Sequence, residues 1–194
     1  MIYDKFAKSY DKAFAPFERR FLSGWRRETL SHLPKNARIL EIGAGTGANF
    51  PFYPTSHHAV ASEISIKMLE IAREKTNDIQ LVQANAEVLP FGENCFDAAF
   101  ATLVFCSIPN PEKAFRDLRR IVKANGVFVL LEHVRPRGLH RFFFDFLNLF
   151  SVALIEDHFN RQTAQIAAVS GLEILEVKEK AFGIFNLIVC KVIK

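Results

Sequence analysis

The sequence has few cysteines and no long apolar run, and each scarcity excludes a class of protein. Its three cysteines, Cys95, Cys106 and Cys190, are scattered through 194 residues and lack the spacing of a zinc site or a disulfide framework. We therefore expect no metal and a reducing, cytoplasmic compartment. No stretch of about 18 apolar residues is available to span a membrane. The N-terminus lacks the uninterrupted apolar core of a signal peptide.

Phenylalanine is abundant where other aromatic residues are scarce, with 20 Phe against 3 Tyr and 1 Trp. Because the core of a domain this size has limited volume, some of these rings should lie at a surface or in a pocket. The net charge of +4 and the pI of about 9.0 suit a solvated surface or an anionic partner, and they do not by themselves imply nucleic acid.

Apolar runs alternate with segments of helical period, which predicts a single α/β domain over residues 1–194 with a parallel sheet covered on both faces. We expect helices on both sides of a break near Pro16, then a helix between the first glycines and Pro51 or Pro54. Later helices are expected over 66–75 and 112–122, and Asn125-Gly126 is expected as a turn. Strands are expected over 37–42, 58–62, 79–83, 97–101, 127–131, 172–177 and 185–192.

Three alternating glycines, Gly43, Gly45 and Gly47, follow the first expected strand. Glycine lets the backbone turn sharply and approach a ligand without a Cβ clash, and backbone amides at a helix start can point into such a site. A tight turn alone would not need three glycines. The pattern therefore predicts a nucleotide-type site at the end of this strand.

Two cofactors fit this loop. The segment 43–48 matches the dinucleotide pattern, and Glu63, twenty residues after Gly43, could accept hydrogen bonds from the ribose of either NAD or S-adenosylmethionine (SAM). Glu41 discriminates between them, because its carboxylate would repel a pyrophosphate and would suit the amino group of methionine. The helical lead-in of roughly 35 residues also differs from dinucleotide folds, which begin with this strand.

The segment 39–47, ILEIGAGTG, resembles motif I of class I SAM-dependent methyltransferases. The resemblance continues in order through 63–69, 83–91, 96–97 and 118–126. It implies a Rossmann-like sheet of about seven strands, mostly parallel with an antiparallel C-terminal strand. Within the class, the chain most resembles the UbiE-like (methyltransferase type 11) branch. It is also similar to phospholipid N-methyltransferases and to membrane-associated methyltransferase-like proteins linked to thiol methylation.

The resemblance assigns roles to individual residues. The glycine loop would cradle the amino-acid part of SAM with Glu41 ordering it, Glu63 would hold the ribose, and Asn85 would accept from the adenine amino group. The implied cofactor-binding set is Tyr10, Glu41, Gly43, Ala44, Gly45, Gly47, Glu63, Ile64, Met68, Asn85, Ala86, Glu87, Thr102 and Leu103. Two departures from the family pattern are Asn85, where the family usually has Asp, and Ala124-Asn125-Gly126, where it has Pro-Gly-Gly.

Methyl transfer from a sulfonium needs alignment of donor and acceptor and exclusion of water. A general base is needed only when the nucleophile arrives protonated. His133, just past the fifth expected strand, is the candidate base, and Glu132 shares its position. Both also have an ordinary interpretation as partly buried structural residues.

Two segments flank the expected core. Residues 1–35 are expected to form a helical lid, and within it 14–27 pairs four arginines with Phe17, Phe21 and Trp25 at helical spacing. This stretch is either an interfacial helix that meets anionic lipid or a helix packed on the sheet edge. Residues 135–165 are expected as the acceptor-site insertion, with five phenylalanines in 142–150.

These features predict a methyltransferase for a small hydrophobic acceptor, such as a quinone precursor or a phospholipid amine, with peripheral membrane contact. A thiol or other small-molecule methyltransferase, a nicotinamide-dependent oxidoreductase and a non-enzymatic SAM-binding module are the alternatives. No nucleic-acid partner is expected, because Thr102-Leu-Val-Phe replaces the motif that positions a flipped base.

Overall fold

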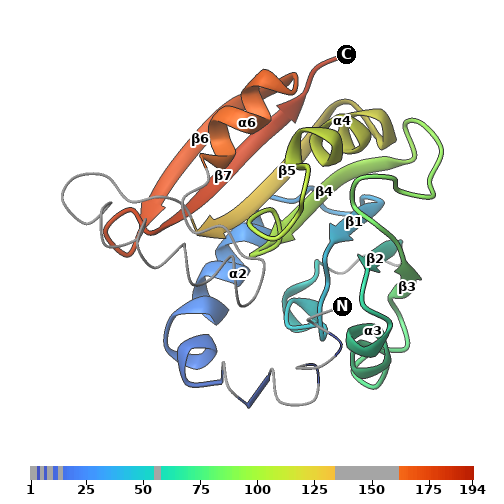
Figure 1. The fold of residues 1–194 in the computed structure, drawn as a ribbon, viewed down its shortest axis with the longest axis vertical. Helices are drawn as coiled ribbons and strands as arrows, with labels where there is room; N and C mark the ends of the chain where they lie inside the picture. Colours follow the sequence, from blue (N-terminus) through green and yellow to red (C-terminus); the bar gives the residue numbers. More distant parts are fainter. Residues whose placement is uncertain (1–3, 5–6, 8–10, 13–14, 55–57, 134–161) are drawn as a thin grey trace.

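The computed structural model describes residues 4, 7, 11–12, 15–54, 58–133 and 162–194. Within these residues, seven strands form one sheet in the order β3-β2-β1-β4-β5-β7-β6 (Figure 1). β7 is antiparallel to both β5 and β6, and every other pairing is parallel, which confirms the expected fold. The strands are β1 (Ile39–Ile42), β2 (Ala59–Glu63), β3 (Gln80–Gln83), β4 (Phe96–Thr102), β5 (Val122–His133), β6 (Leu172–Lys180) and β7 (Phe185–Val192).

Helices cover both faces of this sheet. The described helical elements are η1 (Glu18–Leu22), α2 (Ser23–Ser31), η2 (Phe50–Phe52), α3 (Ile66–Arg73), α4 (Pro111–Ile121) and α6 (Thr163–Val169). On one face, α4 and α6 pack against residues such as Leu40 and Leu130. On the other face, the end of α2 and the η2 region pack against Ile39 and Val129. None of the helices in the described ranges is long and apolar enough to cross a membrane.

The core absorbs part of the phenylalanine excess. Phe105 and Phe115 stack with ring centroids 4.3 Å apart, and Phe128 lies against both rings. Phe96 and Phe100 are also fully buried. Offset aromatic pairs of this kind add to the burial of their area, so they fix α4 and the β4–α4 segment on the sheet.

Two local predictions were wrong. The expected helix after the glycines is a run of turns followed by the single 3-10 turn η2, because Pro51 and Pro54 cannot donate the hydrogen bonds that a longer helix needs. Asn125-Gly126 lies inside β5, where the pairing register shifts from Phe96↔Val122 to Ala98↔Val127. The residues between these pairs form a bulge, with Asn125 at φ 63°, so the strand continues through the expected turn.

The N-terminal helical segment differs from the prediction in its irregularity. Residues 15–17 are helical and lead through the π-helical η1 into α2, so Pro16 breaks no helix within the described range 15–31. Tyr10 and most of the expected acceptor-site insertion, residues 135–161, lie outside the described residues.

Candidate functional site

The glycine loop lies at the carboxyl end of β1, and all three of its glycines have positive φ: 69° at Gly43, 56° at Gly45 and 84° at Gly47. A Cβ at Gly43 would come within 2.5 Å of Val104 Cγ2, and one at Gly47 within 2.5 Å of the Phe50 ring. A Cβ at Gly45 would meet nothing within 4 Å. The outer two glycines are therefore required by packing, whereas Gly45 borders open space that a ligand can fill.

Glu63 joins the end of β2 to this loop. One carboxylate oxygen accepts from the backbone amide of Gly45 and the other from that of Ser65, each at 2.9 Å. The side chain is buried, and desolvation raises its pKa above the ordinary value although the two amide bonds oppose that rise. Because the Gly45 amide points toward this carboxylate, Glu63 helps to fix the conformation of the glycine loop.

Glu41 is fully buried on β1 and its carboxylate is engaged by two side chains that the sequence reasoning missed. Asn49 Nδ2 donates to one oxygen at 2.5 Å, and the Tyr53 hydroxyl donates to the other. Burial raises the pKa of Glu41 above its ordinary value, and burial together with the neighbouring carboxylate raises the pKa of Tyr53. In this arrangement the carboxylate acts on the loop through Asn49 and Tyr53.

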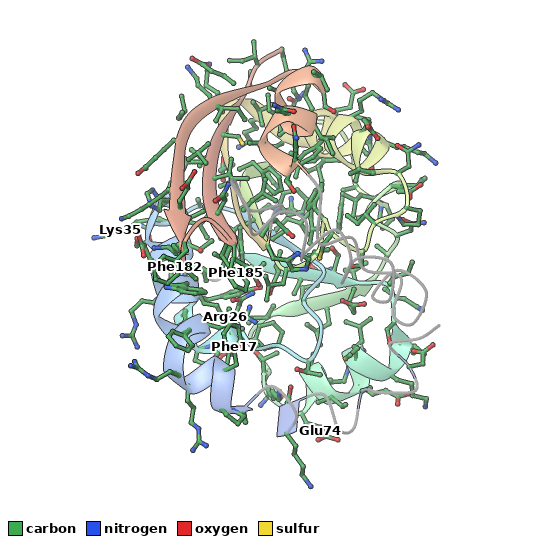
Figure 2. All side chains as sticks on the ribbon, turned by 60° about the vertical axis from the view of Figure 1, so that its left-hand side comes forward. Phe17, Arg26, Lys35, Glu74, Phe182 and Phe185 are labelled. Carbon is green, nitrogen blue, oxygen red and sulfur yellow. The ribbon has the colours of Figure 1, made fainter. Side chains whose placement is uncertain are left out.

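Arg26 brings a positive charge from α2 into the same region (Figure 2). Its Nη1 donates to Thr102 Oγ1 at 2.5 Å and to Asn49 Oδ1 at 3.0 Å, and its Nε donates to Glu18 at 2.9 Å. Asn49 Nδ2 also donates to Thr102 at 2.8 Å. The result is a continuous polar network that ties the N-terminal helical segment to the ends of β1 and β4.

The segment after β4 has an unusual backbone. Leu103 has φ 59°, a left-handed conformation that costs free energy for a residue with a branched side chain. Glu132, fully buried on β5, accepts from the amides of Val104 and Phe105 at 2.9 and 3.0 Å. Because Val104 fills the space beside Gly43, Glu132 holds both the Leu103 turn and the flank of the glycine loop.

Leu103 also lines a cavity of about 250 Å³ between the glycine loop and the N-terminal segment. Its apolar lining comes from Ala15, Leu22, Ala48 and Leu103, and its charged lining from Asp11, Glu18, Arg19, Arg26 and Lys75. An apolar wall beside convergent polar groups suits a small molecule.

His133 ends β5, where it is buried and lies edge-to-face against Phe185 with ring centroids 6.4 Å apart. The structure thus places it at the carboxyl edge, as the sequence predicted. Glu132, the second base candidate, has the different task of holding the backbone amides after β4.

The other residues of the implied cofactor-binding set are divided between the surface and the core. Ile64 is 40% exposed at the end of β2, whereas Met68 is buried on α3. Asn85 Oδ1 accepts from the Glu87 amide and Glu87 accepts from the Asn110 amide, each at 2.9 Å. Ala44 is buried within the glycine loop, and Ala86 packs at the margin of the core.

Acidic residues of the N-terminal segment contact the same edge from outside. Ser65 Oγ donates to Asp4, and Thr46 Oγ1 donates to Asp11, each at 2.6 Å. Lys75 also donates to Asp11, at 2.6 Å. The described part of the N-terminal segment therefore contacts the loops after β1 and β2.

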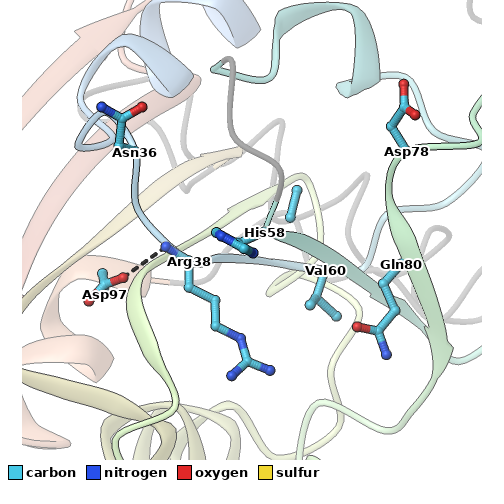
Figure 3. Close-up of a pocket in the computed structure, with 8 residues that line it drawn as sticks. Asn36, Arg38, His58, Val60, Asp78, Gln80 and Asp97 are labelled. Atoms are coloured by element: carbon cyan, nitrogen blue, oxygen red, sulfur yellow. Dashed lines mark hydrogen bonds between the residues drawn. The ribbon is translucent and has the colours of Figure 1, made fainter.

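A larger cavity, of about 450 Å³, lies at the opposite, amino edge of the sheet (Figure 3). Its charged residues are exposed or half-exposed, and Asp97 is paired with Lys123 at 2.6 Å and with the Arg38 amide at 2.8 Å. Ligands of open α/β sheets bind outside the carboxyl ends of the strands. We therefore place the functional site at the carboxyl edge despite its smaller cavity.

Known proteins resemble this chain in sequence and fold. Residues 40–130 match the family described as "Methyltransferase domain". An uncharacterized protein of Methanocaldococcus jannaschii is 36% identical over 66% of the chain and 48% of its own length. The ubiquinone/menaquinone biosynthesis C-methyltransferase UbiE of Vibrio cholerae is 35% identical over 58% of the chain and 48% of its own length. The chain thus spans about half the length of these curated relatives.

A second named methyltransferase and a solved structure are also similar to this chain. A phosphatidylethanolamine N-methyltransferase of Cereibacter sphaeroides is 31% identical over 58% of the chain and 60% of its own length. A solved structure of a SAM-dependent methyltransferase from Thermotoga maritima superposes with a TM-score of 0.78 at 22% identity, covering 98% of each chain. At that identity the superposition speaks to the fold.

Proposed function

We propose that this chain, which belongs to the class I SAM-dependent methyltransferases, transfers a methyl group from SAM to a small hydrophobic acceptor. The observation that carries the proposal is the bond from the Gly45 amide to Glu63. It brings the loop after β1 and the acid after β2 together at the carboxyl edge, beside the open space at Gly45. A SAM molecule needs both features, one for its amino-acid part and one for its ribose.

The residues at this edge fit the cofactor. The space at Gly45 would admit the methionine part, and the Glu63 carboxylate, which has further acceptor lone pairs, would accept from ribose hydroxyls. Exposed Ile64 would lie against the adenine, with Asn85 accepting from its amino group. SAM supplies an electrophilic methyl on a sulfonium centre. The chain's own task is then to align the acceptor and keep water out.

Water exclusion follows from the buried network at this edge. Glu41 and Thr102 are held by Asn49 and Arg26, so these polar groups need no water to satisfy them. Leu103 and Leu22 supply apolar wall to the adjoining cavity. Such surroundings suit an apolar acceptor, and relatives named for quinone and phosphatidylethanolamine methylation support a quinone precursor or a phospholipid amine. A thiol acceptor would fit the same wall.

His133 is proposed as the base for an acceptor that arrives protonated. It stands at the carboxyl end of β5, one residue after Glu132, which holds the Leu103 turn. A His133→Gln variant should then transfer methyl more slowly with little change in SAM affinity, and the loss should shrink at high pH, where the acceptor is already deprotonated. An unchanged pH profile of the transfer rate would remove His133 from the reaction.

The first test is isothermal titration with SAM, with NADH as the competing cofactor. We expect SAM to bind and NADH not to bind, and we expect Glu63→Ala to lose SAM binding. His58→Ala, in the cavity at the amino edge, is the matched control and should bind as the wild type does. Binding of NADH in place of SAM would favour the oxidoreductase and overturn the proposal.

Transfer itself is tested second, with quinone-precursor, phosphatidylethanolamine and thiol acceptors and radiolabelled SAM. Methyl incorporation into one acceptor class identifies it. SAM binding without transfer to any of the three classes would point to the non-enzymatic SAM-binding alternative.

A further inference from the structure

An aromatic cluster lies where the N-terminal helical segment meets the start of β7. Phe17 and Phe21 have ring centroids 5.4 Å apart, and Trp25 lies 6.4 and 6.0 Å from them. Phe185 joins them from β7, at 5.9 Å from Phe17 and 5.1 Å from Trp25. The helical aromatic stripe is therefore packed at the sheet edge on one side.

The other side of this cluster is exposed. Phe17 is 36% and Phe21 42% exposed, and Phe182, in the turn between β6 and β7, is 99% exposed. Figure 2 shows Phe17, Phe182 and Phe185 on the same side of the molecule. In this turn Ala181, Phe182 and Gly183 all have positive φ. A fully exposed phenylalanine in a strained turn contributes nothing to the core, so its apolar area is available to a partner.

Positive charge surrounds these rings. Residues 15–35 contain five Lys or Arg and two Glu, in a chain whose net charge is +4. Arg19, Arg20 and Arg27 are exposed. The guanidinium of Arg20 lies over the Phe21 ring at 5.1 Å, and that of Arg27 over Phe52 at 5.4 Å. Exposed aromatic rings among arginines are suited to a partner with an apolar interior and a negatively charged surface layer.

We propose that this aromatic-basic surface, formed by Phe17, Phe21 and Phe182 with Arg19 and Arg20, docks on a bilayer containing anionic phospholipid. The rings would enter the boundary between headgroups and acyl chains, and the arginines would remain among the phosphates. A second copy of the chain fits less well, because a symmetric contact would place this excess of arginines against itself.

The aromatic-basic surface lies close to the candidate functional site. Phe17, Phe21, Arg19 and Arg20 belong to the helical segment 15–22 that leads directly into α2. Arg26 on α2 reaches Thr102 in the candidate site, so the docked face and the site are joined by continuous helical chain. Docking would place the site beside the bilayer, where a quinone precursor or a phospholipid amine resides. This use rests on the proposed function, whereas the docking itself does not.

The experiment exploits Trp25, the one tryptophan in the sequence. Its fluorescence is recorded with vesicles of phosphatidylcholine alone and of phosphatidylcholine mixed with phosphatidylglycerol, and bound protein is measured by co-sedimentation. We expect a blue shift and binding on the anionic vesicles, both weakened by salt. Arg20→Glu should weaken binding by roughly fivefold or more, since one cation near the surface contributes about 1 kcal/mol. Phe182→Asp should weaken it at least as much.

The matched control is Val169→Asp, which alters an 81% exposed apolar residue at the end of α6, before the β6–β7 hairpin, and should bind as the wild type does. Equal binding by Phe182→Asp and the wild type, or no vesicle binding by the wild type, would overturn the proposal. Light scattering that shows a wild-type dimer lost in Phe182→Asp, without vesicle binding, would assign the surface to a second copy. SAM titration without vesicles is expected to be normal for every variant, so loss of docking and loss of the proposed function are distinguishable.

Discussion

The two edges of the sheet carry similar residue types in opposite surroundings. At the carboxyl edge Glu41, Glu63 and Arg26 are buried and bonded to one another's neighbours. At the amino edge Arg38 and Asp97 line the larger cavity, yet they face water. Ion pairs between solvent-exposed charges contribute little to stability. A buried charge needs a bonded partner, and removal of that partner is strongly destabilising. Burial of partnered charge, and not cavity size, therefore distinguishes the carboxyl edge as the candidate site.

Replacing the buried arginine should produce the largest effect. Arg26→Met removes a cation that holds Glu18, Asn49 and Thr102. It leaves two buried acceptors and a half-buried carboxylate without their donor, at about 1–3 kcal/mol for each group. Arg38→Met at the amino edge removes an exposed charge and a contact 5.0 Å above Phe96, for about 1 kcal/mol or less. Urea unfolding of both variants measures the difference. Equal losses of unfolding free energy would show that the buried arginine contributes no more to stability than the exposed one.

Glu132→Ala should follow in size. It leaves the buried amides of Val104 and Phe105 without their acceptor, at about 1–3 kcal/mol for each group. Glu132→Gln keeps an acceptor oxygen and should recover much of the loss. If the Leu103 turn depends on this bond, SAM affinity falls in the alanine variant and returns in the glutamine variant. Unchanged SAM affinity in both would show that the turn is held by other contacts.

The glycine loop offers a contrast within the carboxyl edge. Gly43→Ala drives a methyl group into Val104, and overpacking with a left-handed alanine costs about 2–3 kcal/mol. Gly45→Ala meets open space and should cost only about 1 kcal/mol in unfolding free energy, while its methyl group obstructs SAM. Thermal unfolding and SAM titration together separate the two. Normal SAM binding by Gly45→Ala would move the cofactor away from this glycine.

The edges should also respond oppositely to pH. Burial raises the pKa of Glu41 above 4.5, so its contribution to stability is present below that pH and is lost as pH rises through the folded-state pKa. Lys123 and the Arg38 amide lower the pKa of Asp97 below 3.8, so its contribution is lost as pH falls. Glu41→Gln should therefore flatten the decline of stability above pH 4.5. Asp97→Asn should flatten the acid limb instead, as urea titrations across pH would show.

The smallest effects are expected in the cavity at the amino edge. His58→Ala and Gln80→Ala alter two of its lining residues and should change the unfolding free energy by less than about 0.5 kcal/mol. SAM affinity should stay at the wild-type value. A clear loss of SAM binding in either variant would mean that this cavity, and not the carboxyl edge, receives the cofactor.

The fold was predictable because parallel strands buried on both faces read as apolar runs, and β1, β2 and β4 all do. The prediction of a helix after the glycines was wrong. Composition alone does not reveal that Pro51 and Pro54 leave too few residues between them and the glycines for a regular helix. The extension of β5 through Asn125-Gly126 was missed because a bulge and a turn use the same residues.

Within the site, positions fixed by the backbone were predictable, and those fixed by tertiary contact were not. Gly43, Gly45 and Glu63 follow from strand ends and spacing. Arg26 looked like one of four arginines on a helix, although its spacing of four from Leu22 and from Leu30 already placed it on their buried face. Asn49 and Tyr53 gave no signal, because only the folded chain brings them to Glu41.

The internal position of the last strand, β7, affects how the chain folds during synthesis. Among the strands in the described residues, β6 pairs with β7 alone, and β7 lies between β5 and β6. Until residues 185–192 have left the ribosome, β6 has no neighbour and β5 presents an open edge. Such edges are templates for wrong pairing. Nascent chains that stall before residue 185 would therefore be the most prone to aggregate. The last of these seven strands to emerge, β7, is the one that pairs β6 with the rest of the sheet through β5.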